Sequence, residues 1–151
     1  MISFDITNFT KQTVSIKILE KVAIFVTGRL KLKGELSLVL AGDKRLQTLN
    51  REFRGYDKPT DVLTFSAPRE MKNALGEIFI NLNDCRRPHK YNEVFSEKKS
   101  FHYILIFLLI HGLLHLAGDD DRTEKGRLQM VFRGKKIMQE LFKNVIIKAN
   151  L

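Results

Sequence analysis

The sequence predicts an α+β domain in which a small mixed sheet of about four strands is covered by helices. Four short segments are predicted to be strands, and three of them place apolar residues at every second position, the period of a half-buried strand. Segments with apolar stripes at helical spacing lie between and after them. A run that is apolar on every side, Tyr103 to Ile110, predicts a central buried helix that carries two histidines. At 151 residues, the chain is expected to form one domain spanning residues 1–151.

The first half of the chain is expected to form two parallel strands joined by a helix. Ile2, Phe4 and Ile6 alternate with polar residues and predict a strand, and residues 35–41 (ELSLVLA) predict a second one. Between them, residues 14–30 carry an apolar helical stripe. A strand–helix–strand order favours a parallel pair with a right-handed crossover.

A second helix and two further strands are expected to follow. Asp43 is a candidate cap for a helix over residues 44–54, which Gly55 would end. Beyond a polar turn at 55–61, strands are predicted over residues 62–66 and 76–82, separated by a loop at 67–75.

The C-terminal half is expected to be helical. Pro88 argues against one continuous helix through residues 83–93. Ser96 with Glu97 is a plausible start for the helix that contains the apolar run. A last helix is predicted from about residue 123 to 148, with Gly134 as a possible weak point.

The segment HGLLHLAGDDD, residues 111–121, contains the pattern of a metal site. His111 and His115 are four residues apart, so on a helix their imidazoles lie on one face. Gly118 is suited to end that helix in a left-handed turn, after which residues 119–121 supply three carboxylates. A histidine pair and one ligand from the next turn make a three-point site with an open position, as catalytic metals have.

Two plainer interpretations of this segment are weaker. A single buried histidine at a helix end is usually a hydrogen-bonded core residue, but two with this spacing and a following aspartate cluster are harder to explain in that way. A membrane helix would need about 20 mostly apolar residues. Residues 101–117 include His102, His111 and His115 and number only 17.

The chemistry expected of such a site is metal-assisted hydrolysis. A zinc ion with three protein ligands leaves a position for water, whose pKa it lowers toward ~7. Gly112 stands where zinc proteases of the HExxH type have a glutamate base, which argues against peptide substrates. Arg54, at a helix end beside a polar turn, could form a bidentate pair with a phosphate. An ordinary surface arginine near a helix C-terminus is the alternative, and the residues alone slightly favour it.

Charge and composition favour a polyanionic partner inside a reducing compartment. Lys and Arg number 26 against 17 acidic residues, giving a formal charge of +9. Residues 122–148 alone hold eight basic and two acidic side chains. The single cysteine, Cys85, cannot form an internal disulfide, and the first residues lack the pattern of a signal peptide. We therefore expect a cytoplasmic protein.

Three segments in matching order resemble the YbeY family of bacterial metal-dependent endoribonucleases, which mature and quality-check ribosomal RNA. They are residues 49–65 (LNREFRGYDKPTDVLTF), 75–80 (LGEIFI) and 111–121. The resemblance implies one zinc ion per chain, with His111 and His115 as its first two ligands. It also implies that Arg54 engages the phosphate or supports catalysis. Arg54 and Lys58, in the same segment, are the candidate substrate-binding residues.

The sequence departs from the family pattern at the third ligand. The family motif ends in a third histidine, and Asp121 stands in its place. Aspartate is a chemically sound zinc ligand, so a His-His-Asp site is expected. Its negative charge should make the metal a weaker Lewis acid. Asp119 and Asp120 remain alternatives for the third position.

The resemblance and the charge together predict a zinc-dependent single-strand endoribonuclease that acts in ribosomal RNA maturation, including 3′-end processing of the small-subunit RNA, and in ribosome quality control. Expected partners are ribosomal RNA and the small subunit or its assembly factors, with no membrane and no small-molecule cofactor. The attacking group could be metal-activated water or the RNA's own 2′-OH. The alternatives are a non-catalytic basic assembly factor with a structural metal, and a metallohydrolase of another substrate class.

Overall fold

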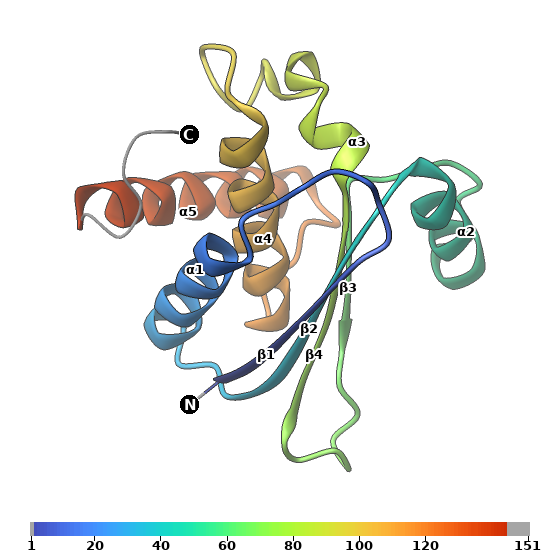
Figure 1. Cartoon of the computed structure of the whole chain (residues 1–151), viewed down its shortest axis with the longest axis vertical. Helices are drawn as coiled ribbons and strands as arrows, with labels where there is room; N and C mark the ends of the chain where they lie inside the picture. Colours follow the sequence, from blue (N-terminus) through green and yellow to red (C-terminus); the bar gives the residue numbers. More distant parts are fainter. Residues whose placement is uncertain (1, 145–151) are drawn as a thin grey trace.

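The computed structural model describes residues 2–144 and confirms the predicted α+β class (Figure 1). Its elements, in chain order, are β1 (Ile2–Asn8), α1 (Ile16–Arg29), β2 (Gly34–Ala41), α2 (Asp43–Arg54), β3 (Val62–Ser66), β4 (Ala74–Asn81), α3 (Leu82–Cys85), the 3-10 turn η1 (Pro88–Tyr91), α4 (Phe101–Leu116) and α5 (Glu124–Lys143). The last four residues of the predicted C-terminal helix, 145–148, lie outside the described residues.

The four strands form one mixed sheet in the order β1-β2-β4-β3. β1 is parallel to β2, as the strand–helix–strand pattern predicts, and β2 is parallel to β4. β3 runs antiparallel to β4, because only a short loop joins the two strands. This order leaves β3 as one edge of the sheet, a position that matters for the site.

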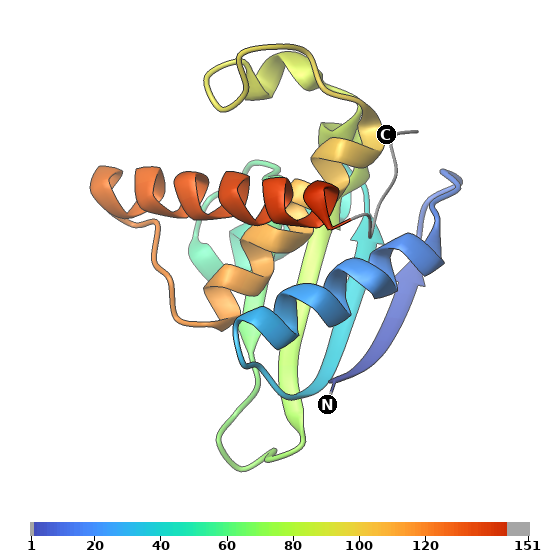
Figure 2. The ribbon, with the colours of Figure 1, turned by 90° about the vertical axis from the view of Figure 1, so that its left-hand side faces the viewer.

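Helices cover the two faces of the sheet unequally. α1 and α4 pack on one face, α5 packs against these two helices on the same side, and α2 lies on the other face (Figures 1 and 2). The main core lies between the sheet and the group formed by α1, α4 and α5. A smaller apolar cluster under α2 contains Ala41, Leu46 and Leu63. Both faces of the sheet are thus covered by helices, the first more fully than the second.

α4 is the central buried helix that the apolar run predicts. Residues 104–110 are all buried, and so are Leu113 and Leu114. Gly112 allows the helix to approach the sheet closely, because a Cβ atom there would lie 2.8 Å from Cγ2 of Ile78 on β4. The helix is 16 residues long, and among the described residues no helix has both the length and the apolarity to cross a membrane.

Two predicted helix starts are wrong. α2 is capped by Gly42, while Asp43 is the first helical residue, and its carboxylate accepts hydrogen bonds from Arg87 and Asn81. α4 begins after Ser100 rather than at Ser96, and the Ser100 hydroxyl caps it by accepting from the Tyr103 amide at 3.2 Å. The two residues that hold Asp43 lie 38 and 44 positions further along the chain.

Three other local features differ little from expectation. β4 begins at Ala74, two residues before the predicted start. Pro88 opens the short turn η1, in keeping with the absence of a continuous helix there. α5 continues through Gly134 without interruption, because this glycine packs against Phe107 and a Cβ atom would lie 3.1 Å from that ring.

Candidate metal centre

His111, His115 and Asp121 bring three donor atoms together at the end of α4. Nε2 of His111 lies 3.2 Å from Nε2 of His115, and Oδ2 of Asp121 lies 3.3 Å from each. In tetrahedral zinc sites with bonds of about 2.0–2.1 Å, ligand atoms are about 3.3–3.4 Å apart. The donor set therefore fits a metal ion in both atom type and spacing. Within residues 2–144 it is the one group of three His, Cys, Asp or Glu side chains with this property.

The end of α4 explains why these three residues meet. Gly118 adopts a left-handed φ of 105°. Its amide donates to the His115 carbonyl at 3.0 Å, and the Asp119 amide donates to Leu114 at 3.0 Å. This paired capping pattern reverses the chain within two residues. The following loop then returns Asp121 to the imidazoles.

Ion pairs explain why Asp121, and not a neighbouring aspartate, faces the histidines. Asp119 is held by Arg133 of α5, and Asp120 accepts a hydrogen bond from Nε of Arg122 at 2.7 Å. Both of these carboxylates are therefore already engaged by arginines. Of the three aspartates that the sequence left open, the structure places Asp121 beside His111 and His115.

The electrostatics of the site favour the protonation states that bind a metal. The hydrogen bond from His111 lowers the pKa of Asp121 to about 2, against the opposing effect of burial. The pKa of His115 is lowered, first by its burial and then by the neighbouring His111. An ionised carboxylate and a neutral imidazole are the ligand forms that metal binding requires.

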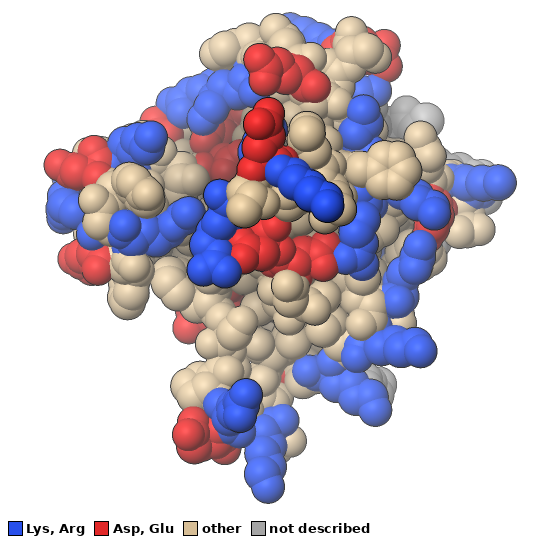
Figure 3. All heavy atoms as spheres, turned by 180° about the vertical axis from the view of Figure 1, so that it is seen from behind, with Lys and Arg blue, Asp and Glu red and all other residues tan. Residues whose placement is uncertain are grey.

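The three donor atoms open onto a cavity of about 720 Å³. Its walls are the end of α2, the edge strand β3, the last turn of α4 and the loop after it. Arg54 lines this cavity from α2, and among the described residues no carboxylate pairs with its guanidinium. Carboxylates gather in a hollow on this side of the molecule, with basic side chains on both flanks (Figure 3). The arginine is thus free to bind an anion that enters from solvent.

Lys58, by contrast, does not line the cavity. Its ammonium lies 5.9 Å from the centre of the Tyr56 ring, and the Arg54 guanidinium carbon lies at the same distance from that ring. The two cations therefore lie near the same exposed aromatic ring, and of the two only Arg54 lines the cavity.

Two residues at the site were not singled out from the sequence. Asp61 lines the cavity, and its carboxylate accepts a hydrogen bond from the Tyr91 hydroxyl at 3.0 Å. Its place directly before a predicted strand was the available signal. Arg133 holds Asp119 from 14 residues away, and no sequence pattern could have paired them before the direction of α5 was known.

Fold and site together define a small α+β protein with a candidate catalytic metal centre in an open cavity suited to an anionic substrate. A family model described as "Endoribonuclease YbeY" matches residues 3–142. The chain therefore belongs to the YbeY family, which confirms the resemblance in its three motifs and the predicted enzyme class.

Individual relatives agree. An Endoribonuclease YbeY of Chelativorans sp. (strain BNC1) is 37% identical over 115 residues, covering 73% of this chain and 68% of the relative. One of Brevibacillus brevis is 32% identical over 127 residues, covering 74% and 77%. The solution structure of TM1509 from Thermotoga maritima superimposes with a TM-score of 0.56 at 24% identity, covering 99% of this chain and 97% of that one. This last similarity concerns the fold.

Proposed function

We propose that this chain is a zinc-dependent endoribonuclease that cleaves single-stranded RNA during ribosomal RNA maturation and ribosome quality control in the cytoplasm. The observation that carries the proposal is the triangle of donor atoms, 3.2–3.3 Å apart, opening onto the cavity that Arg54 also lines. Family membership supports an RNA phosphodiester as the bond cleaved, since the relatives are named endoribonucleases.

Each residue of the site has a distinct part in this proposal. His111, His115 and Asp121 would hold one zinc ion, which when bound supplies a Lewis acid for the phosphodiester and activates water. Arg54 would donate two parallel N–H bonds to the phosphoryl oxygens and stabilise the charge that develops on them. Because no described carboxylate competes for Arg54, the guanidinium need not break an ion pair to bind.

The basic C-terminal segment supports RNA as a substrate. The described part, residues 122–144, holds seven basic and two acidic side chains. Such an excess next to an anionic cavity would attract the phosphates that flank the cleaved one while leaving room for a metal ion at the centre. Small-subunit RNA and its assembly factors are the partners we propose.

Metal analysis combined with cleavage of a single-stranded RNA tests the proposal. We expect about one zinc per chain, cleavage that stops with chelator, and recovery when zinc is returned. His111→Ala, expressed and purified in parallel, should lack both metal and cleavage and so controls for contaminating nuclease. Product ends identify the nucleophile, because attack by the 2′-OH leaves a 2′,3′-cyclic phosphate and attack by water does not. RNA binding without metal-dependent cleavage would instead indicate a non-catalytic assembly factor.

A further inference from the structure

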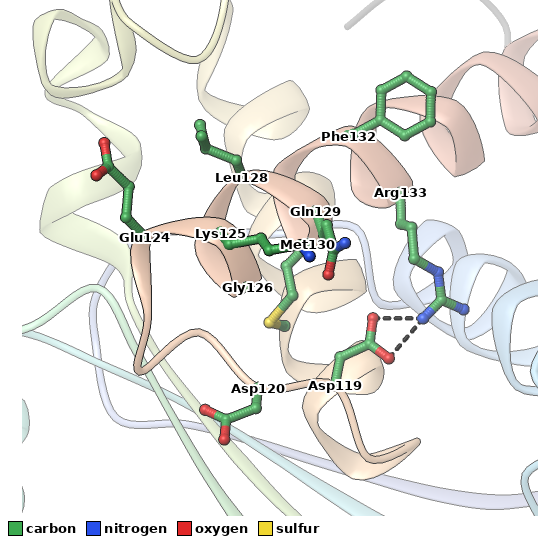
Figure 4. Close-up of a pocket in the computed structure, with 10 residues that line it drawn as sticks. All are labelled: Asp119, Asp120, Glu124, Lys125, Gly126, Leu128, Gln129, Met130, Phe132 and Arg133. Carbon is green, nitrogen blue, oxygen red and sulfur yellow. Dashed lines mark hydrogen bonds and ion pairs between the residues drawn. The ribbon is translucent and has the colours of Figure 1, made fainter.

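A second hollow, of about 760 Å³, lies directly beside the candidate metal centre. Figure 4 shows its lining side chains, which come from α5 and from the loop before it. Asp119 and Asp120 line both this hollow and the metal-site cavity, so the two spaces adjoin each other at these residues. A strand that extends from the metal centre toward α5 would meet this surface.

The outer face of α5 has an unusual arrangement of side chains at this point. Phe132 is 69% exposed and Leu128 is 54% exposed. Lys125, Leu128, Phe132 and Lys136 are spaced by three, four and four residues, so they form one stripe along the helix. Among the described residues, no other aromatic ring or cation packs on the Phe132 ring. An exposed aromatic face between lysines is the arrangement that binds single-stranded nucleic acid by stacking and phosphate contacts.

The carboxylates in this hollow do not oppose that use. Arg133 neutralises Asp119, and Arg122 neutralises Asp120. The remaining acid on the lining, Glu124, is followed immediately by Lys125. The surface is thus near neutral at its floor and basic along α5, which suits a base resting on the floor with its phosphates directed toward the lysines.

We propose that the hollow on α5 is a nucleotide subsite, in which Phe132 stacks on a base of the RNA strand whose neighbouring phosphodiester lies at the metal centre. This inference rests on the proposed endoribonuclease activity. It assigns a substrate-positioning role to Phe132 and places the stacked base in a nucleotide that adjoins the cleaved bond. Because stacking is tolerant of base identity, the subsite selects single-stranded RNA without selecting its sequence.

The test uses the full chain with its metal and RNAs of about twelve nucleotides carrying 2-aminopurine at successive positions, because single-strand sites span roughly that length. Read immediately after mixing and before turnover, the probe fluorescence should be quenched at one position. Phe132→Ala and Phe132→Leu should remove this quenching and raise KM roughly tenfold with little change in kcat, while Phe132→Tyr should retain both properties. Because Phe132 is so exposed, none of these changes removes core packing.

Ile24→Ala is the matched control, since Ile24 is a comparably exposed apolar residue (60%) on α1. It should change neither quenching nor KM. If wild type cleaves the RNA but Phe132→Ala shows unchanged quenching and KM, the subsite is refuted while the endoribonuclease stands. If wild type neither binds nor cleaves RNA, the endoribonuclease proposal itself fails. A wild-type dimer that Phe132→Ala converts to monomer would assign this face to a second copy of the chain and also refute the subsite.

Discussion

Replacing Arg54 by alanine should separate catalysis from folding. The side chain is exposed and lines the metal-site cavity, and its guanidinium carbon lies 5.9 Å from the centre of the Tyr56 ring. An exposed side chain without a partner contributes little to stability, so the free energy of unfolding should change by less than about 0.5 kcal/mol. Zinc content should also be unchanged, because no donor atom of the site belongs to Arg54.

The expected loss of activity follows from what the guanidinium would do. Removing a preorganised donor to a developing negative charge typically costs about 3 kcal/mol in the transition state. This corresponds to roughly a hundredfold slower single-turnover cleavage. Arg54→Lys keeps the charge but loses the two-pronged donor geometry, so it should recover only part of the rate.

Arg51→Ala provides the control within the same helix. Arg51 lies three residues earlier, pairs with Asp57 at 3.3 Å and is absent from the cavity lining. Exposed ion pairs of this kind contribute about 0–1 kcal/mol, so neither stability nor cleavage should change much. Normal cleavage by Arg54→Ala would refute the proposed phosphate contact and support the plain helix-end interpretation. Equal losses in both variants would point to a general charge effect.

Three further changes test other parts of the structure. Asp121→Ala should lose zinc during dialysis against a weak chelator while Asp121→His retains it, as metal analysis would show; full retention by the alanine variant would remove Asp121 from the ligand set. RNA affinity should fall steeply with salt, and charge reversal at Lys135 and Lys136 should weaken it without loss of zinc; a salt-independent affinity would contradict a phosphate-led interface. Gly112→Ala should lower the free energy of unfolding in urea by about 1–3 kcal/mol, because its Cβ would clash with Ile78. Adding Ile78→Ala should relieve the clash. An unchanged unfolding midpoint for Gly112→Ala would show that α4 can shift freely.

Local patterns predicted the elements well because each pattern depends on nearby residues alone. Alternation located β1, β2 and β4, the short segment after the polar turn was predicted as β3, and the apolar run located α4. The order of strands in the sheet could not be obtained in this way. β4 lies between β2 and β3. Hydrogen bonds between strands distant in sequence set this pairing, and the apolar period within one strand does not reveal which strand will be its neighbour.

The two errors at helix starts have the same physical origin. Asp43 has the residue type of a cap, but Arg87, 44 residues later, binds its carboxylate and leaves Gly42 at the cap position. Ser96 precedes an acidic residue, as a helix cap often does. The ring of Phe95, directly before it, packs against Phe107, with the ring centres 5.0 Å apart, and this contact holds the chain around Ser96 outside the helix. Tertiary contacts outweigh local preferences of about 1 kcal/mol.

The candidate site shows the same division between local and distant information. The spacing of His111 and His115 is a property of one helix and was predicted directly from the sequence. The choice among three adjacent aspartates was not, because it depends on arginines that hold the other two, one of them on α5. Sequence chemistry therefore predicted an aspartate as the third candidate ligand, and only the fold showed which aspartate lies beside the histidines.

The edge position of β3 explains how residues so distant in sequence can share one cavity. α2 packs on one face of the sheet and α4 on the other, so in the sheet interior the strands would keep Arg54 apart from the histidines. β3 is short, five residues, and ends the sheet, so the ends of both helices can meet around it. Exposed strand edges are usually shielded because their free backbone groups pair with other chains. Here the edge forms a wall of the cavity, where an extended RNA strand could pass from Arg54 across the metal centre toward α5. An endoribonuclease cleaves within a polymer, so the proposed site needs space on both sides of the metal centre, and a cavity at the edge of the sheet suits that need.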